Sequence, residues 1–154
     1  MTMEHSRALD EARIRTAIGE RANALRAKGV GGFVSRHAAT FATFDRSPRL
    51  RRSGAAALGE GREGWLSAFR GSVGCEIHDL SITAGDDEAL CHGLVRITGS
   101  GTSGDQIDVW APATFCLRKV DGAWKVTNEH TPLPFYMDGS AKPAADLADY
   151  SAKA

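Results

Sequence analysis

The dipeptide Asp121-Gly122 constrains the fold of this chain most, because it joins two long β-rich runs, 108–120 and 123–131. Asp-Gly between runs of alternating apolar residues favours a type I′ hairpin, a turn whose two central residues both need a positive φ. Helical patterns precede this hairpin in the sequence. The sequence therefore predicts helices packed on a curved antiparallel sheet, a framework that can enclose a small-molecule pocket.

Size and charge narrow the classes of function. The chain has 154 residues, enough for one domain with its own core, and its 19 Lys and Arg balance its 19 Asp and Glu. We therefore expect no nucleic-acid partner and no anionic membrane surface. A basic cluster at 46–52 lies in a Pro-containing loop without interleaved aromatic residues, which favours a solvated loop over a phosphate-binding patch.

The cysteines and the N-terminus indicate a cytoplasmic protein. Cys75, Cys91 and Cys116 are widely spaced and form no Cys-x-x-Cys pair, so we expect neither a disulfide framework nor a zinc site. The first residues lack the apolar core of a signal peptide, and no run approaches the roughly 20 apolar residues of a membrane span.

Hydrophobic periodicity predicts the elements in order. Helical spacing covers 6–28 and 31–37, a Thr- and Phe-rich strand covers 39–45, a loop covers 46–53, and a Gly-containing helix covers 55–70. The period then changes to two, which predicts strands at 73–83, 89–99, 106–120 and 123–132. These four strands form a meander.

This element order, together with several short motifs, resembles the nuclear transport factor 2-like superfamily. The motifs are Ala24-Leu-Arg-Ala-Lys-Gly29, Arg52-Ser-Gly54, Val120-Asp-Gly-Ala-Trp-Lys-Val126 and Asn128-Glu-His130. Within it, Cys91-His-Gly-Leu-Val-Arg96 and Pro134-Phe-Tyr-Met-Asp-Gly139 are most similar to SnoaL-like and ketosteroid-isomerase-like proteins. The resemblance implies an α+β fold, a cone-shaped antiparallel sheet wrapped around helices with cystatin-like topology. It implies a single domain at 1–139, followed by a C-terminal tail at 140–154.

The ketosteroid isomerase pattern, anchored on Arg52-Ser-Gly54, places Asp45 at the position of the general base. The alternative is that Asp45 ends its strand and binds the Arg-rich loop. Arg21 stands where the family has its oxyanion-hole tyrosine, and Thr114 stands where it has a protonated aspartic acid, so true ketosteroid isomerisation is not expected. Arg21 lies among apolar positions, so it either points inward, toward Asp45 or a substrate carboxylate, or points to solvent after a one-residue shift.

The same comparison assigns faces to the later strands. It places His92 and Arg96, with Leu90 and Leu94, on the concave face beside Trp110 and Thr114, and it turns Val109, Ala111, Ala113, Phe115 and Leu117 outward. A sheet that is apolar on both faces predicts a homodimer through the outward set. His92 is a candidate acid, base or hydrogen-bond donor, with a structural histidine as the alternative. Trp65 and Phe69 complete the predicted pocket.

Two phases compete for the last strand. Periodicity from Trp124 and Val126 puts Asn128 and His130 on the inner side, whereas the family comparison turns Glu129 and Thr131 inward. No metal is expected there, because neighbouring residues of a strand point to opposite faces and cannot grip one ion together.

These patterns predict a SnoaL-like pocket protein without cofactor or metal, whose partner is a small apolar or aromatic metabolite. The predicted activity is acid-base isomerisation or elimination next to a carbonyl, with Asp45 as base and His92 or Arg21 stabilising the oxyanion. The alternative is a non-catalytic ligand-binding or dimeric interaction module of the same fold.

Overall fold

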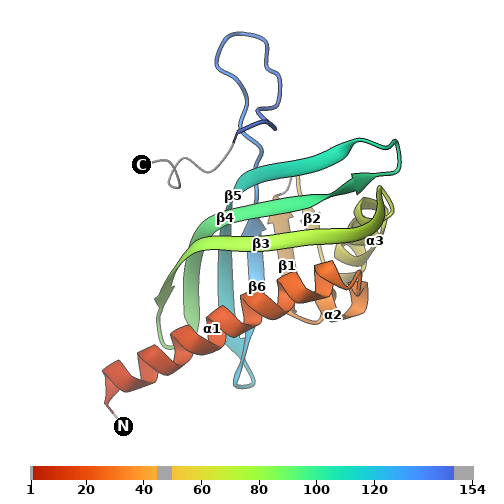
Figure 1. Ribbon diagram of the computed structural model, residues 1–154. Helices are drawn as coiled ribbons and strands as arrows, with labels where there is room; N and C mark the ends of the chain where they lie inside the picture. Colours follow the sequence, from red (N-terminus) through yellow and green to blue (C-terminus); the bar gives the residue numbers. More distant parts are fainter. Residues whose placement is uncertain (1, 45–49, 148–154) are drawn as a thin grey trace.

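Three helices and six strands make up the part of the chain described by the computed structural model, residues 2–44 and 50–147 (Figure 1). The helices are α1 (Met3–Arg26), α2 (Val30–Val34) and α3 (Ala55–Leu66). The strands are β1 (His37–Phe44), β2 (Arg52–Ser53), β3 (Phe69–Ala84), β4 (Glu88–Gly101), β5 (Gln106–Val120) and β6 (Ala123–His130).

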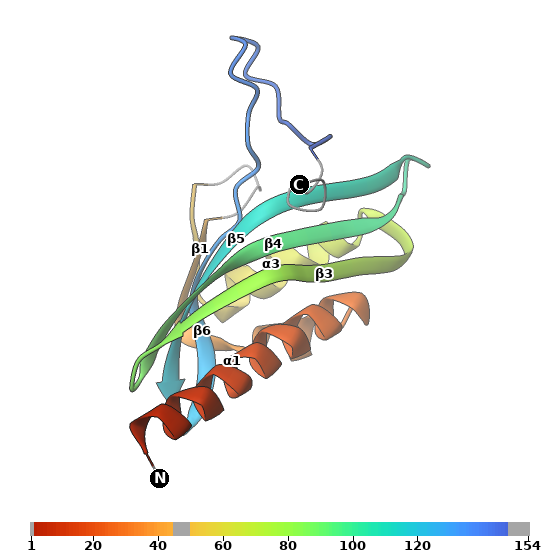
Figure 2. The ribbon, with the colours of Figure 1, turned by 60° about the vertical axis from the view of Figure 1, so that its left-hand side comes forward.

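All six strands form one sheet in the order β2-β1-β6-β5-β4-β3. β1 runs parallel to β6, and the other neighbours are antiparallel. Asp121 and Gly122 have φ of 51° and 80°, as the predicted hairpin turn requires. Figure 2 shows the sheet curving around α1 and α3, so the expected α+β cone with a four-strand meander is confirmed.

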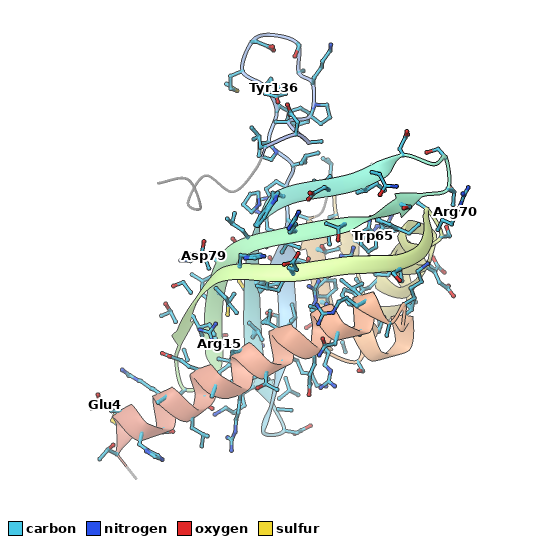
Figure 3. The ribbon with its side chains drawn as sticks, in the orientation of Figure 1. Glu4, Arg15, Trp65, Arg70, Asp79 and Tyr136 are labelled. Atoms are coloured by element: carbon cyan, nitrogen blue, oxygen red, sulfur yellow. The ribbon has the colours of Figure 1, made fainter. Side chains whose placement is uncertain are left out.

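Irregular positions in β3 produce part of this curvature. The register with β4 shifts between His78 and Ser81, where Asp79 adopts a φ of 53°, and Figure 3 shows Asp79 at the bend of the strand. Opposite the bulge stands Gly93, where a Cβ would lie 2.8 Å from the backbone oxygen of His78. A side chain at position 93 would therefore collide with the bulged backbone, which explains the glycine in the middle of a strand.

The element boundaries agree with the sequence patterns within a few residues, with two exceptions. The third helix ends at Leu66 and not near residue 70, because β3 already begins at Phe69. The loop predicted at 46–53 contains the short strand β2, which pairs with β1 through Ala42 and Thr43.

The predicted phase of β4 and β5 is wrong. The residues that face the helices are Cys91, Val95 and Ile97 of β4 and Ala111, Ala113, Phe115 and Leu117 of β5. They belong to one core with the apolar stripe of α1, which includes Ile14, Ile18 and Leu25. Most of the set that was expected to face a second subunit is thus the interior of the monomer. Since the outer face carries apolar residues too, such as Leu90 and Trp110, a period of two could not tell the faces apart.

After β6, residues 132–147 leave the sheet as an arm (Figure 1). Phe135 pairs with Pro143, and the Tyr136 hydroxyl donates to Asp146. The domain boundary at residue 139 stays a prediction. None of the described helices is long and apolar enough to cross a bilayer.

Candidate functional site

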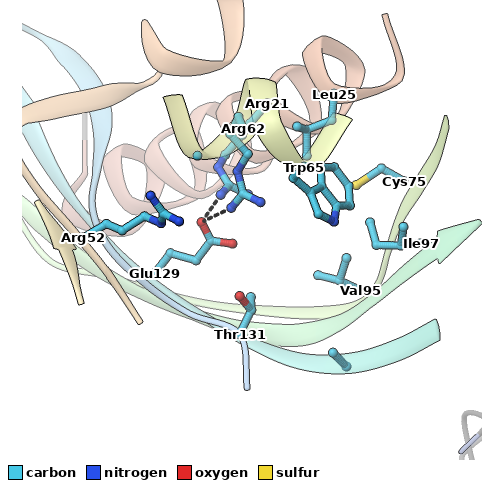
Figure 4. A pocket seen from close by; sticks show the side chains of 12 residues that line it. Arg21, Leu25, Arg52, Arg62, Trp65, Cys75, Val95, Ile97, Glu129 and Thr131 are labelled. Atoms are coloured by element: carbon cyan, nitrogen blue, oxygen red, sulfur yellow. Dashed lines mark hydrogen bonds and ion pairs between the residues drawn. The ribbon is translucent and has the colours of Figure 1, made fainter. Parts of the chain in front are cut away.

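A cavity of about 260 Å³ lies between the concave face of the sheet and the helices α1 and α3 (Figure 4). Its apolar wall includes Leu25, Trp65, Val95 and Ile97, and its polar wall holds three arginines and a glutamate. The described residues that line it are Arg21, Leu25, Arg52, Gly61, Arg62, Trp65, Cys75, Val95, Ile97, Ala111, Glu129 and Thr131. Among these described residues, three guanidinium groups and one carboxylate form a polar wall that the sequence did not lead us to expect.

Arg21 and Glu129 form a buried ion pair at the centre of the polar wall. Arg21 projects from α1, Glu129 from β6, and each is only 4% exposed. One terminal nitrogen of Arg21 donates to Oε2 of Glu129. Burial lowers the pKa of Arg21, and the carboxylate of Glu129 opposes that effect. Of the two orientations considered for Arg21, the structure has the inward one, and the described anionic partner of its guanidinium is Glu129.

His37 holds the other side of the Arg21 guanidinium. Arg21 Nε donates to His37 Nε2 at 3.2 Å, so Nδ1 of His37 carries the proton and donates to the backbone oxygen of Phe33 at 2.9 Å. Burial, followed by the positive charge of Arg21, lowers the pKa of His37 to about 3. His37 is therefore neutral at physiological pH, and it fixes the direction in which Arg21 points.

Arg62 differs from Arg21 in its hydrogen bonds. It extends from α3, and its guanidinium lies 5.0 Å from the ring centre of Phe33 and 5.6 Å from that of Trp65. A terminal nitrogen lies 3.6 Å from Oε2 of Glu129, which is within ion-pair range but beyond good hydrogen-bond distance. Its Nε is buried and has no hydrogen-bond partner among the described residues. Arg62 thus keeps an unsatisfied buried donor at the cavity.

Arg52 reaches the cavity across a glycine of α3. A Cβ built on Gly61 would lie 3.1 Å from Cζ of Arg52, so the guanidinium packs directly over the helix backbone. In Figure 4, Arg52 points toward the same end of the cavity as Glu129. Gly61 therefore provides the space that lets Arg52 line the cavity.

A β-bulge in β6 explains why each of the two phases considered for the last strand is correct for one part of it. Trp124 and Val126 are buried at a period of two, but the register with β5 passes from Leu117–Val126 to Cys116–Asn128. Thr127 is the extra residue, and after it the odd-numbered positions face inward. Glu129 and Thr131 are consequently buried, and His130 is exposed. The family comparison gave the correct orientation for Glu129.

The structure brings together only part of the predicted site. Trp65 lines the cavity, and Phe69 packs against it edge to face with ring centres 5.0 Å apart. The inward placement of His92, Arg96, Trp110, Thr114 and His130 is wrong. His92 and His130 are exposed, and the other three lie half-buried on the outer face because β4 and β5 have the opposite phase.

On the outer face, Arg96 and Trp110 form a surface cluster of their own. Arg96 donates to both carboxylate oxygens of Asp108 at 2.9 and 2.8 Å, and its guanidinium lies 5.5 Å from the ring centre of Trp110. The His78 ring packs on the other edge of this cluster, 4.8 Å from Trp110. Asp45, the predicted base, lies outside the described residues.

Sequence reasoning missed Arg62, Arg52 and His37. A detectable signal existed for Arg62, because it lies four residues after Leu58 and four before Leu66, on the apolar stripe of its helix. The same spacing had singled out Arg21. For Arg52, no pattern could show that Gly61 leaves room for its side chain.

Comparisons with known proteins identify the fold. No protein-family model and no curated protein sequence matches the chain. Among solved structures, a nuclear transport factor 2-like protein of unknown function from Pseudomonas putida KT2440 superposes with a TM-score of 0.82 at 27% identity, over 92% of this chain and 97% of that one. A candidate scytalone dehydratase from Novosphingobium aromaticivorans superposes with a TM-score of 0.79 at 15% identity, over 95% and 100% of the two chains.

A third neighbour is a candidate dehydratase of the same superfamily from Streptomyces avermitilis, with a TM-score of 0.73 at 14% identity over 82% of this chain and 97% of that one. The chain therefore has the nuclear transport factor 2-like fold, and the resemblance noted in its sequence is confirmed at that level.

Proposed function

We propose that this chain is a SnoaL-like protein that binds a small cyclic or aromatic carbonyl compound in the cavity and catalyses its isomerisation or an elimination without a cofactor. One observation carries the proposal: a buried carboxylate, Glu129, stands beside guanidinium groups in a cavity with an apolar wall. Two neighbours of the same fold are candidate dehydratases, which is consistent with elimination chemistry but is a property of those proteins.

Glu129 has the geometry of a general base. Its contacts with Arg21 and Arg62 both use Oε2. In Figure 4 its other carboxylate oxygen points toward the middle of the cavity. Arg21 and His37 fix the carboxylate, so Oε1 can meet a substrate proton without a change of rotamer. Glu129 takes over the role that the sequence suggested for Asp45.

The reaction needs a donor for the developing oxyanion as well as a base. When Glu129 removes a proton next to a carbonyl, the C–H electron pair forms the enolate double bond and the negative charge moves to the carbonyl oxygen. The guanidinium groups of Arg62 and Arg52 line the same cavity and supply positive charge for that oxygen. The proton then returns to another carbon in an isomerisation, or a leaving group departs in an elimination.

Deuterium exchange tests this proposal without knowledge of the natural substrate. The protein is incubated in D₂O with small cyclic ketones such as cyclohexanone and 2-indanone, and loss of the α-hydrogen signals is followed by NMR. We expect wild-type protein to accelerate exchange and Glu129→Gln to abolish the acceleration. The matched control is Glu63→Gln on the exposed side of α3, which should exchange like wild type. Acceleration that survives in Glu129→Gln would contradict Glu129 as the base.

A non-catalytic binding module is the second candidate function. The observation that favours it is the Arg21–Glu129 ion pair, because an anchored carboxylate also serves to orient cations for ligand binding. Ligand binding that is unaccompanied by exchange in any ketone of the panel would favour this candidate.

We also propose a homodimer through the outer face of the sheet, which presents Leu90, Leu94, Trp110 and Pro112. Leu90 is 47% exposed, a large value for an apolar residue on a strand that has neighbours on both sides. Leu90→Asp should therefore shift the protein toward monomer in light scattering. Wild-type protein that is monomeric at high micromolar concentration would contradict the dimer.

A further inference from the structure

The arrangement of arginines identifies the class of ligand more closely than the proposed reaction does. We infer that the cavity receives an organic carboxylate. This ligand has one carboxylate group, which Arg62 holds, and an apolar ring, which packs on the apolar wall. This inference rests on the proposed function in that it uses the same cavity. It adds the charge and shape of the ligand.

The first argument is the balance of charge. Among the described lining residues, Arg21 and Arg62 share one carboxylate, that of Glu129. Glu129 is already bound to Arg21, and Arg62 lies 3.6 Å from the same oxygen. A guanidinium that is removed from water needs an anionic partner or hydrogen-bond acceptors to offset its desolvation. An anionic ligand supplies both.

The second argument is the unsatisfied donor of Arg62. Arg21 uses its Nε for His37 and a terminal nitrogen for Glu129. Arg62 Nε, in contrast, is buried without a partner among the described residues. Nε–H and a terminal N–H of one guanidinium form a fork that matches the two oxygens of a carboxylate. A carboxylate is the acceptor that matches this fork best, because its two oxygens can take both N–H groups.

The third argument concerns the remainder of the ligand. The apolar wall of the cavity includes Trp65, Val95 and Ile97, and Figure 4 shows all three on the side of the cavity away from Arg52. A volume of about 260 Å³ lies below the usual range of about 300–1,000 Å³ for drug-sized ligands. The cavity therefore suits one small ring with its carboxylate. When Arg62 binds the carboxylate, Arg52 is the lining residue whose positive charge serves the carbonyl oxygen of the proposed reaction.

Calorimetric titration of the full chain with benzoate and benzamide tests this inference, because the two probes share shape and differ in charge. Charge-assisted hydrogen bonds discriminate by roughly tenfold or more, so we expect wild-type protein to bind benzoate at least that much more tightly than benzamide. Arg62→Met, which keeps an unbranched stem of similar length, should remove this preference. Arg118→Met on the exposed end of β5 should retain it.

A second pair of variants covers the case in which Arg62→Met fails to fold. Gly61→Ala places a methyl group against Arg52, whereas Gly64→Ala in the same helix meets nothing within 4 Å. We expect Gly61→Ala to weaken benzoate binding several-fold, because its methyl group moves the positive charge of Arg52 away from the cavity that holds the carboxylate, and Gly64→Ala to leave binding unchanged.

Equal affinity for benzoate and benzamide, or no binding of benzoate at millimolar concentration, would overturn the carboxylate inference. Tighter binding of phenyl phosphate than of benzoate would overturn it as well, in favour of a phosphate ester. None of these results touches the proposed function if neutral ketones still exchange their α-hydrogens through Glu129. Conversely, binding of benzoate that depends on Arg62, in the absence of any exchange, would support this inference while the proposed reaction fails.

Discussion

Among the described residues, two buried carboxylates lie on α1 or contact it, and their charges are neutralised in different ways. Asp10 belongs to the helix itself, near its N-terminal half, and Glu129 meets the helix at Arg21. The two helix positions are about 16 Å apart along the axis at 1.5 Å per residue. Asp10 is matched by one cation, whereas Glu129 is contacted by two.

The Asp10 site is fully satisfied. Oδ1 accepts from Trp124 Nε1 at 3.2 Å, and Lys119 Nζ lies 3.1 and 3.2 Å from the two carboxylate oxygens. Lys119 also lies over the Trp124 ring, 5.1 Å from its centre. Burial raises the pKa of Asp10, but the hydrogen bonds from Lys119 and Trp124 outweigh this and lower it. This arrangement fastens the β5–β6 hairpin to the helix.

The Glu129 site, in contrast, is left incomplete. It borders a cavity, it sets two guanidinium groups against one carboxylate among the described residues, and it includes a buried nitrogen of Arg62 without a described partner. A purely structural ion pair gains nothing from this excess of cations. The difference teaches that burial and pairing alone do not mark a functional site, whereas an unsatisfied donor beside an open volume does.

Glu129→Ala is expected to cause the largest loss of stability, about 3 kcal/mol, because it leaves the buried guanidinium of Arg21 without its anionic partner. Urea unfolding measures the loss. Because benzoate also takes the place of the missing carboxylate, it should stabilise Glu129→Ala more than it stabilises wild type or Glu63→Ala, whose exposed side chain lies outside the cavity. A loss below about 1 kcal/mol would show that Arg21 does not depend on Glu129.

Asp10→Ala is expected to cost about 2 kcal/mol, since Trp124 Nε1 loses its acceptor in a buried position. Benzoate should stabilise this variant no more than it stabilises wild type, because the Asp10 oxygens face partners from the protein and not a cavity. Asp86→Ala, on an exposed turn, is the matched control and should stay within about 0.5 kcal/mol of wild type. Stabilisation of Asp10→Ala by benzoate beyond that of wild type would remove the distinction between the two sites.

Acidification should destabilise the Glu129 site through His37. The folded-state pKa of His37 is about 3, below its ordinary value of 6.5, so the unfolded chain takes up a proton that the folded chain refuses. The contribution of neutral His37 to the free energy of unfolding is fully present above about pH 6.5 and is lost as the pH falls toward about 3. By about pH 5 the loss amounts to about 2 kcal/mol. Urea unfolding above about pH 6.5 and at about pH 5 measures this loss, and the loss should be absent in His37→Gln. An unchanged pH dependence in that variant would contradict a buried neutral His37.

The smallest expected effect is a gain in stability. Gly64 lies in the exposed interior of α3 with open space around its Cα, so Gly64→Ala should stabilise the protein by up to about 1 kcal/mol. Gly61→Ala should gain less, because its methyl group displaces Arg52. Equal gains in thermal denaturation would show that Arg52 moves aside freely.

The sequence predicted the fold more fully than the site, for physical reasons. Turn chemistry at Asp121-Gly122 and helical spacing around Ile18 and Leu25 depend on local properties that the sequence records directly. The prediction of which face of β4 points inward relied on its apolar pattern alone. Both faces of this strand carry apolar residues, so Leu94 and Val95 were equally good candidates for the core. Glu129 was placed through family resemblance, while the bulge at Thr127 misled simple periodicity.

A crystal structure of the protein soaked with 4-bromobenzoate tests the central claim most directly, because the anomalous signal of bromine locates the ring independently of the protein phases. We predict one bound molecule in the cavity, with a carboxylate oxygen within hydrogen-bond distance of Arg62 Nε and the bromine on the side of Trp65, Val95 and Ile97. An empty cavity at saturating concentration, or bromine sites only on the outer surface, would contradict the assignment of the Glu129 site as a ligand site.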